Sequence, residues 1–348
     1  MASIPVANIY YLLCYAWNEF APRQMDRYAA EEFPDTLHLF ARQLIIGIHS
    51  LHRRGLETGY ISFGESTSTP RGRICMAPSI RTMTARPRSL YCAFDEIRTD
   101  VPSNQILKAT LKRLIGVDAL GAQLRRELRQ TVALLPGVCD VGLNARVFHA
   151  VGHRQSNRLY SFLLTICRFL HGCMDALDRP GRYRFREVGR DEARMRRIFE
   201  KFVRNFFARR QSMFKVRSER MNWFATASEG SDLGFLPVMS TDASLRSAHR
   251  TIIIECKYTD SLYQSRFLAE KLRSAHLYQL CSYLRNIEYN GEADSVAEGI
   301  LLYPTAGHSL DQSYQLHGHR VSLRTLDLSQ PWTGIEEQML SLIRPSQG

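Results

Sequence analysis

Two charged residues, Glu255 and Lys257, interrupt an otherwise apolar run over residues 251–258. The run is rich in β-branched residues, which predicts a strand covered on both faces. Because residues two positions apart point to the same side of a strand, both charged side chains share one face. Burying an acid and a lysine costs free energy unless they pair or bind a ligand. We therefore expect them to do chemistry; the competing interpretation is an edge strand with an exposed ion pair.

Asp242 supplies a second carboxylate if the chain reverses at a turn over residues 247–249. Such a hairpin would bring Asp242 beside Glu255. These two acids and the backbone carbonyl of Cys256 could give hard oxygen ligands to Mg²⁺, or to Mn²⁺ in its place. Lys257 could then hold the attacking water or the scissile phosphate. The expected catalytic residues are Asp242, Glu255 and Lys257.

An aspartate followed thirteen residues later by Glu-x-Lys at the end of an apolar strand resembles the motif of PD-(D/E)xK nucleases. No proline precedes Asp242, so the Pro-Asp half of that motif is represented by its aspartate alone. Gln279 and Tyr283 lie four residues apart on a helix expected at 267–287 and share the face opposite its apolar stripe. They resemble the Gln-x-x-x-Tyr motif of RecB-like nucleases, which implies a role in positioning DNA; two solvated polar residues are the alternative.

Glu200 is a weaker candidate for a further metal ligand. It lies on the flank of the apolar stripe of a helix expected at 191–210, where an acid can enter a cleft. Arg204 is expected on the face of this helix opposite the stripe. A surface glutamate of an amphipathic helix is the more frequent explanation of this pattern.

The elements around these residues predict an α+β chain of two domains. The first domain, residues 1–180, would contain a helix from Ile9 to Phe20 capped by Asn8, a helix over 36–52, a strand-rich part with β-hairpins over 55–95 and a helical part over 104–177. After a Pro/Gly linker, residues 181–348 would form an α/β domain. Its expected order is a helix at 191–210, strands at 214–218, 236–245 and 251–258, the helix at 267–287, and strands at 299–303 and 320–328.

The composition restricts the partners of the chain. Its 348 residues carry a net charge of +12, which favours a polyanionic partner. Eight scattered cysteines without a CxxC pair predict reduced, mostly buried thiols, and no apolar stretch is long enough to cross a bilayer. We expect a soluble cytoplasmic protein without a membrane partner. Because the GxxxxGK[ST] loop is absent, we also expect that this chain binds no nucleotide itself.

A closer resemblance runs along nearly the whole chain. Residues 4–17 (IPVANIYYLLCYAW) resemble the opening of the McrC family, the nuclease subunits of McrBC-type modification-dependent restriction systems. Further similar stretches follow in the same order, at residues 53–56, 71–74, 104–108, 183–185 and 276–280. The resemblance implies an N-terminal part that docks on a hexameric AAA+ GTPase and a C-terminal PD-(D/E)xK domain that cuts DNA carrying modified cytosine. It assigns Asp242 and Glu255 as the metal-binding acids and Lys257 as the catalytic lysine.

The leading hypothesis is therefore a Mg²⁺-dependent endonuclease subunit. The alternative is a non-catalytic DNA-binding adaptor that activates an NTPase and keeps a relic nuclease fold; the intact Asp242, Glu255 and Lys257 argue against it. Arg71 and Arg73, in the strand-rich part, have two interpretations of equal weight. They belong either to an exposed basic hairpin that attracts DNA, or to a projection that enters the pore of the GTPase ring and stimulates hydrolysis.

Overall fold

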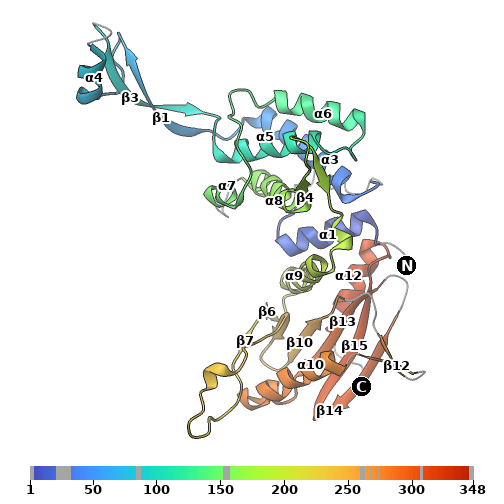
Figure 1. The fold of residues 1–348 in the computed structure, drawn as a ribbon. Helices are drawn as coiled ribbons and strands as arrows, with labels where there is room; N and C mark the ends of the chain where they lie inside the picture. Colours follow the sequence, from blue (N-terminus) through green and yellow to red (C-terminus); the bar gives the residue numbers. More distant parts are fainter. Residues whose placement is uncertain are drawn as a thin grey trace. The chain divides into compact units, whose positions relative to one another are not determined.

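The structure, a computed structural model, describes residues 4–20, 33–83, 88–151, 157–258, 263–266, 269–272, 274–305 and 309–344. The chain divides into two compact units. Unit 1 comprises residues 1–21, 26–36 and 187–348, and unit 2 comprises residues 22–25 and 37–186. Each unit is described by itself (Figure 1). None of the described helices is long and apolar enough to cross a membrane.

Unit 2 combines a helical body with a projecting arm. The helices of the body are α3 (Thr36–Arg54), α5 (Pro102–Ile115), α6 (Ala122–Ala133), α7 (Ala145–Ala150) and α8 (Arg158–Cys173), and a short hairpin joins β4 (Met174–Ala176) to β5 (Tyr183–Phe185). Apolar side chains of α3, α5 and α8, such as Phe40, Leu107 and Phe162, are fully buried. Amphipathic spacing therefore predicted this body well, with helix ends displaced by a few residues.

The arm is a three-stranded antiparallel sheet with one short helix. It consists of β1 (Gly59–Thr67), β2 (Arg73–Ile74), α4 (Met76–Met83) and β3 (Leu90–Arg98), in the strand order β1-β3-β2. At about 3.3 Å per residue, the nine-residue strands β1 and β3 extend for roughly 30 Å, and Figure 1 shows them leading away from the helices. Gly72 turns the chain at a φ of +69°, where an added Cβ would lie 2.5 Å from the Ala93 carbonyl oxygen. The expected strands are present, whereas α4 was not foreseen.

Unit 1 is built around a six-stranded mixed sheet in the order β14-β15-β13-β10-β9-β6. Its elements are α1 (Val6–Trp17), α9 (Glu192–Arg210), β6 (Lys215–Arg217), β7 (Arg220–Met221), β8 (Met239–Ser240), β9 (Ala243–Arg246), β10 (Thr251–Cys256), β11 (Tyr263–Arg266), β12 (Ala269–Leu272), α10 (Ser274–Ile287), α11 (Glu292–Ser295), β13 (Glu298–Thr305), β14 (Asp311–Leu316), β15 (His319–Asp327) and α12 (Trp332–Ser341).

A crossover through α10 links two neighbouring parallel strands, β10 and β13. Parallel strands need such a connection, and the helix then covers one face of the sheet. Leu280 and Leu284 of α10 pack with Ile253 of β10 and Leu301 of β13 in one buried cluster. Gly299 permits the close approach, because a Cβ there would lie 2.8 Å from Leu284 and 3.0 Å from Leu280.

The first helix belongs to the unit of the C-terminal residues, and not to the docking part with which the sequence analysis grouped it. Tyr15 of α1 packs edge-on against Phe202 of α9, with ring centroids 5.8 Å apart. Asn8 is not the expected helix cap. It lies within α1, is 4% exposed, and donates from Nδ2 to the carbonyl oxygens of Leu328 (2.8 Å) and Gln330 (2.9 Å). Apolar burial of α1 therefore overrides the cap that the local sequence suggested.

Two further expectations about unit 1 need correction. The helix expected at 267–287 begins at Ser274, and residues 269–272 form β12, which pairs with β11; Phe267 lies outside the described residues. The strand expected at 236–245 divides into β8 and β9, with Asp242 between them. All eight cysteines are free thiols, and five of them are buried, as expected.

Candidate functional site

Glu255 and Lys257 lie at the end of β10, on the side of the sheet that α10 covers. The residues of β10 are all buried, and Ile253, on the same side as Glu255, packs against α10. Glu255 is 3% exposed, and Lys257 Nζ donates to its Oε1 at 2.8 Å. The Oε2 atom of Glu255 is buried and has no hydrogen-bond partner. The buried interpretation of the strand is therefore correct, and the exposed edge strand is not.

Asp242 reaches the same point because β9 and β10 form the expected hairpin. The two strands are antiparallel, with Ala243 opposite Ile254, so Asp242 precedes β9 beside the last residues of β10. Its Oδ2 accepts a hydrogen bond from the Cys256 backbone N–H at 2.8 Å. Thr241, next to it, is fixed by Glu219, whose carbonyl accepts from the Thr241 N–H at 3.0 Å. The carboxylate of Asp242 is thus held against the strand that carries Glu255.

The pKa values of Glu255 and Asp242 are both raised, which is typical of acids that are buried close together. Burial and the charge of Asp242 raise the pKa of Glu255 to about 7, although Lys257 opposes this shift. Burial also raises the pKa of Asp242. A divalent cation would stabilise the ionised forms of two such buried carboxyl groups. Perturbed acids of this kind concentrate at functional sites.

Gln279 and Tyr283 are connected to the predicted site by hydrogen bonds that lead to Lys257. Gln279 Oε1 accepts from Lys257 Nζ at 2.6 Å, and Gln279 Nε2 donates to the Tyr283 hydroxyl at 2.6 Å. That hydroxyl donates to the Ser240 carbonyl at 3.1 Å. Tyr283 is 5% exposed and belongs to the apolar cluster under α10, so it does not lie opposite the core stripe as expected. The pair forms a chain of hydrogen bonds, here named the lysine relay, from Lys257 to Ser240.

Helix α9 adds one predicted and one unforeseen residue. Glu200 is partly buried, and its pKa is raised by burial and by the charge of Asp242, which brings its carboxyl into the electrostatic field of the site. Arg204, expected on the opposite face, donates from Nη1 to the backbone carbonyl of Asp242 at 3.1 Å. Helical spacing gave no signal for this contact, because it depends on how α9 packs near the loop before β9.

The donor set fits a magnesium ion of the kind that retains several waters. Within the described ranges, no three carboxylate, imidazole or thiolate groups gather at metal-ligand spacing. Mg²⁺ is commonly held by one or two carboxylates, with water completing its shell. The unpartnered Oε2 of Glu255 supplies a buried oxygen of the required type. Asp242 and Glu255, with Glu200 nearby, are therefore suitable ligands.

The two arginines of the arm have different surroundings. Arg71 donates to Glu65 Oε1 at 2.6 Å, lies 3.6 Å from Glu96, and places its guanidinium 3.8 Å from the centroid of the Phe94 ring. Arg73 is exposed on β2, and among the described residues it forms no ion pair. The charge of Arg71 is thus largely used within the arm, while that of Arg73 is available to a partner.

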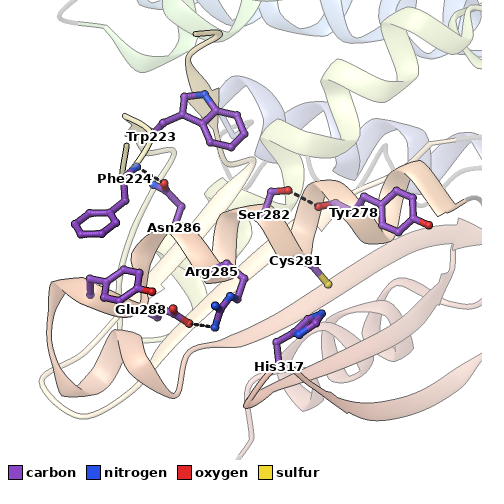
Figure 2. Close-up of a pocket in the computed structure, with 10 residues that line it drawn as sticks. Trp223, Phe224, Tyr278, Cys281, Ser282, Arg285, Asn286, Glu288 and His317 are labelled. Carbon is purple, nitrogen blue, oxygen red and sulfur yellow. Dashed lines mark hydrogen bonds and ion pairs between the residues drawn. The ribbon is translucent and has the colours of Figure 1, made fainter. Parts of the chain in front are cut away.

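A groove of about 560 Å³ lies on the outer face of α10, and the candidate catalytic residues do not line it. Figure 2 shows Asn286 of α10 beside the segment that leads toward β8, with its Oδ1 accepting from the Phe224 N–H at 2.6 Å. The Nδ2 of Asn286 also donates to the Asn222 carbonyl at 2.6 Å. Phe224 also stacks on Tyr289 with ring centroids 4.5 Å apart. The groove therefore anchors a loop and is separate from the carboxylate site.

The raised pKa of Glu255 predicts a pH-dependent stability. In the metal-free protein, between pH 4.5 and about 7, the folded chain keeps a proton on Glu255 that the unfolded chain has released. The free energy of unfolding should therefore fall as the pH rises through this window, by at most roughly 3 kcal/mol. Urea unfolding in a chelator at pH 5 and pH 8 measures this, with Glu255→Gln as the variant that lacks the effect. The gap between parent and variant should change with pH, whereas the gap for the exposed Glu229→Gln should stay constant; a constant gap for Glu255→Gln contradicts the prediction.

Comparison with known proteins gives one family. A family model described as "McrBC 5-methylcytosine restriction system component" matches residues 7–304. The chain is 31% identical over 340 residues to the "Type IV methyl-directed restriction enzyme EcoKMcrBC" of Escherichia coli K12, covering 97% of both chains. Its fold is similar to that in a half-complex from a tetradecameric assembly of Thermococcus gammatolerans McrB AAA+ hexamers with bound McrC. That match has a TM-score of 0.63 and 13% identity, and covers 97% of this chain and 76% of the other.

The family match spans most of the sequence, and the E. coli relative is aligned almost from end to end. The alignment includes both α1 and the strands that carry Asp242, Glu255 and Lys257. The chain therefore belongs to the McrBC restriction-system family, as a McrC-like component.

Proposed function

We propose that this chain is a Mg²⁺-dependent DNA endonuclease subunit with its active site at Asp242, Glu255 and Lys257. The observation that carries the proposal is the buried Glu255 carboxylate, one oxygen of which is paired with Lys257 while the other has no partner. A buried unpaired carboxylate oxygen is costly, and strands rarely retain one without a ligand. The arrangement of two acids and a lysine at the end of β10 supports a PD-(D/E)xK domain in unit 1.

The residues present can divide the work of hydrolysis. Asp242 and Glu255 would hold Mg²⁺, which when bound supplies Lewis-acid stabilisation to a phosphodiester. An ammonium group has three N–H donors, and those of Lys257 are used twice, by Glu255 and Gln279. One donor therefore remains for the attacking water or for a phosphoryl oxygen, where charge develops as the bond to the leaving 3′-oxygen breaks.

The substrate and the partner that we propose for this chain are inferred from the proteins to which it is similar. The E. coli relative is named as a methyl-directed restriction enzyme, and the T. gammatolerans assembly contains AAA+ hexamers with bound McrC. We infer that this chain docks on a AAA+ GTPase ring, stimulates it, and cuts double-stranded DNA that carries modified cytosine. The arm of unit 2 suits docking, because it exposes Ile74 of β2 and Met76 and Ile80 of α4.

Removal of any one catalytic side chain should abolish cleavage without unfolding the chain. Asp242→Ala, Glu255→Ala and Lys257→Ala should each lower Mg²⁺-dependent cleavage by the assembled complex by at least about a hundredfold, the scale on which electrostatic groups act. Stability should hold or rise for the two acids, because their mutual repulsion is relieved. Cleavage on gels and thermal unfolding are measured together.

The matched control is Glu229→Gln, an exposed acid of the same unit. It should cut at the parental rate. Full cleavage by the assembled Lys257→Ala protein would reject the assignment, and would favour the alternative of an adaptor whose nuclease fold is not used.

The lysine relay should position Lys257 and so contribute partially. Gln279→Ala removes one of two anchors of the ammonium group, and Tyr283→Phe removes the hydroxyl while keeping the buried ring. We expect cleavage to fall about tenfold in each variant, a typical effect of misplacing a catalytic group. Ser282→Ala, on the same helix, should have no effect. Parental rates for both relay variants over a range of DNA concentrations would contradict this role.

The arm should act on the partner through Arg73 more than through Arg71. Arg73→Ala should reduce the partner's nucleotide turnover several-fold in the absence of DNA, since its charge is free to contact the ring; Arg344→Ala in unit 1 serves as control. Arg71→Ala should instead loosen the arm, because it loses Glu65 and Phe94. If Arg73 served only DNA attraction, DNA-free turnover would be unchanged and the salt slope of DNA binding would fall by about 0.9.

A further inference from the structure

The net positive charge of the chain comes from the unit without the carboxylate site. Unit 2 contains 24 lysines and arginines against 10 aspartates and glutamates, a net charge of +14. Unit 1 contains 22 against 24, a net charge of −2. The unit proposed to cut DNA therefore offers the polyanion no net attraction. A surface that holds the substrate must be sought in unit 2.

Helix α6 presents two arginines whose charges are not neutralised. Arg126 and Arg129 are exposed and three residues apart, so they lie on one face of the helix. Within the described part of the chain, neither forms an ion pair. Glu127, the helix's sole acid, is engaged by Arg42 of α3 and by Gln123 Nε2 at 3.2 Å. Figure 1 shows α6 at the periphery of unit 2.

The hairpin β4–β5 extends this basic face. The Tyr183 N–H donates to the Gly116 carbonyl at 3.1 Å, which places the hairpin beside the end of α5, where the loop to α6 begins. Asp118 is there contacted by Arg182 and lies 3.9 Å from Arg125 Nη1. Arg125 Nε is buried without a hydrogen-bond partner. Asp118 thus pairs with Arg125 and Arg182, whereas Arg126 and Arg129 form no ion pair within the described residues. We name these four arginines, 125, 126, 129 and 182, the arginine strip.

We propose that the arginine strip binds the phosphate backbone of duplex DNA and holds it for the nuclease unit. This inference rests on the proposed function in taking DNA as the substrate. The guanidinium fork donates in pairs to phosphate oxygens, and four residues of helix separate Arg125 from Arg129 by about 6 Å of rise. Contacts to phosphates fix position without reading bases. The strip therefore supplies affinity that is independent of sequence and of base modification.

A salt titration tests the strip. The full chain carrying Arg126→Gln and Arg129→Gln is compared with the parent for binding a labelled, unmodified duplex of about 25 base pairs by fluorescence anisotropy, in EDTA, at 50–200 mM salt. Each lost phosphate contact lowers the slope of log K against log salt by about 0.9. We expect a slope smaller by about 1.8. The control, Lys215→Gln with Arg344→Gln, removes two exposed charges from unit 1 and should keep the parental slope.

The other outcomes overturn the proposal. An unchanged slope in the strip variant, an equal fall in the control, or no duplex binding by the parent would each reject the strip as the DNA surface. Parental duplex binding combined with weaker assembly on the AAA+ partner would assign this face to the protein partner. Because EDTA prevents cleavage, these results do not depend on the catalytic residues. A failure of the nuclease assignment would appear only in the cleavage assays.

Discussion

The half-satisfied carboxylate of Glu255 is the constraint on which the rest of the site depends. A charged group at 3% exposure must be compensated, and one ion pair compensates only one of its oxygens. Lys257 is in turn fixed by Gln279, and Gln279 by Tyr283, so a chain of contacts from β10 through α10 to the strand before Asp242 maintains one geometry. The fold thus stores an electrostatic cost at this point that a cation and an anionic substrate would relieve.

The two units also differ in net charge, and this difference affects how each would attract a polyanion. Buried acids make the site itself repel a polyanion, and the surface of unit 1 does not offset this, with its net charge of −2. Unit 2 has the opposite balance and lacks the carboxylate site. In the proposed function, chemistry and attraction would therefore be carried by different parts of the chain, and unit 1 alone would have little affinity for DNA.

Spacing along the sequence predicted the features that depend on one element or one turn. The shared face of Glu255 and Lys257, the hairpin that returns Asp242, and the apolar stripe of α9 all follow from local periodicity. Features that depend on neighbours in space were missed. The sequence of a helix does not show whether solvent or another element faces a polar residue. Tyr283 was therefore expected on the solvent side of α10, although it lies in the apolar cluster. The contact of Arg204 with the Asp242 carbonyl was missed for the same reason. Asn8 lies inside the buried helix α1, so it binds the carbonyls of Leu328 and Gln330 and does not cap the helix.

The placement of α1 has a consequence for synthesis on the ribosome. This apolar helix is made before unit 2, whereas its packing partner α9 begins at Glu192, after all of unit 2. At about 5–20 residues per second, the nascent chain extends for roughly 10–35 s before α9 is made, and about 15–60 s before Leu328 can accept from Asn8. All residues of unit 2 precede α9, so unit 2 can complete its folding in that interval. During synthesis the chain thus passes through a stage in which unit 2 is folded while the apolar face of α1 still lacks its packing partner. In that period α1 exposes apolar surface that a chaperone could cover.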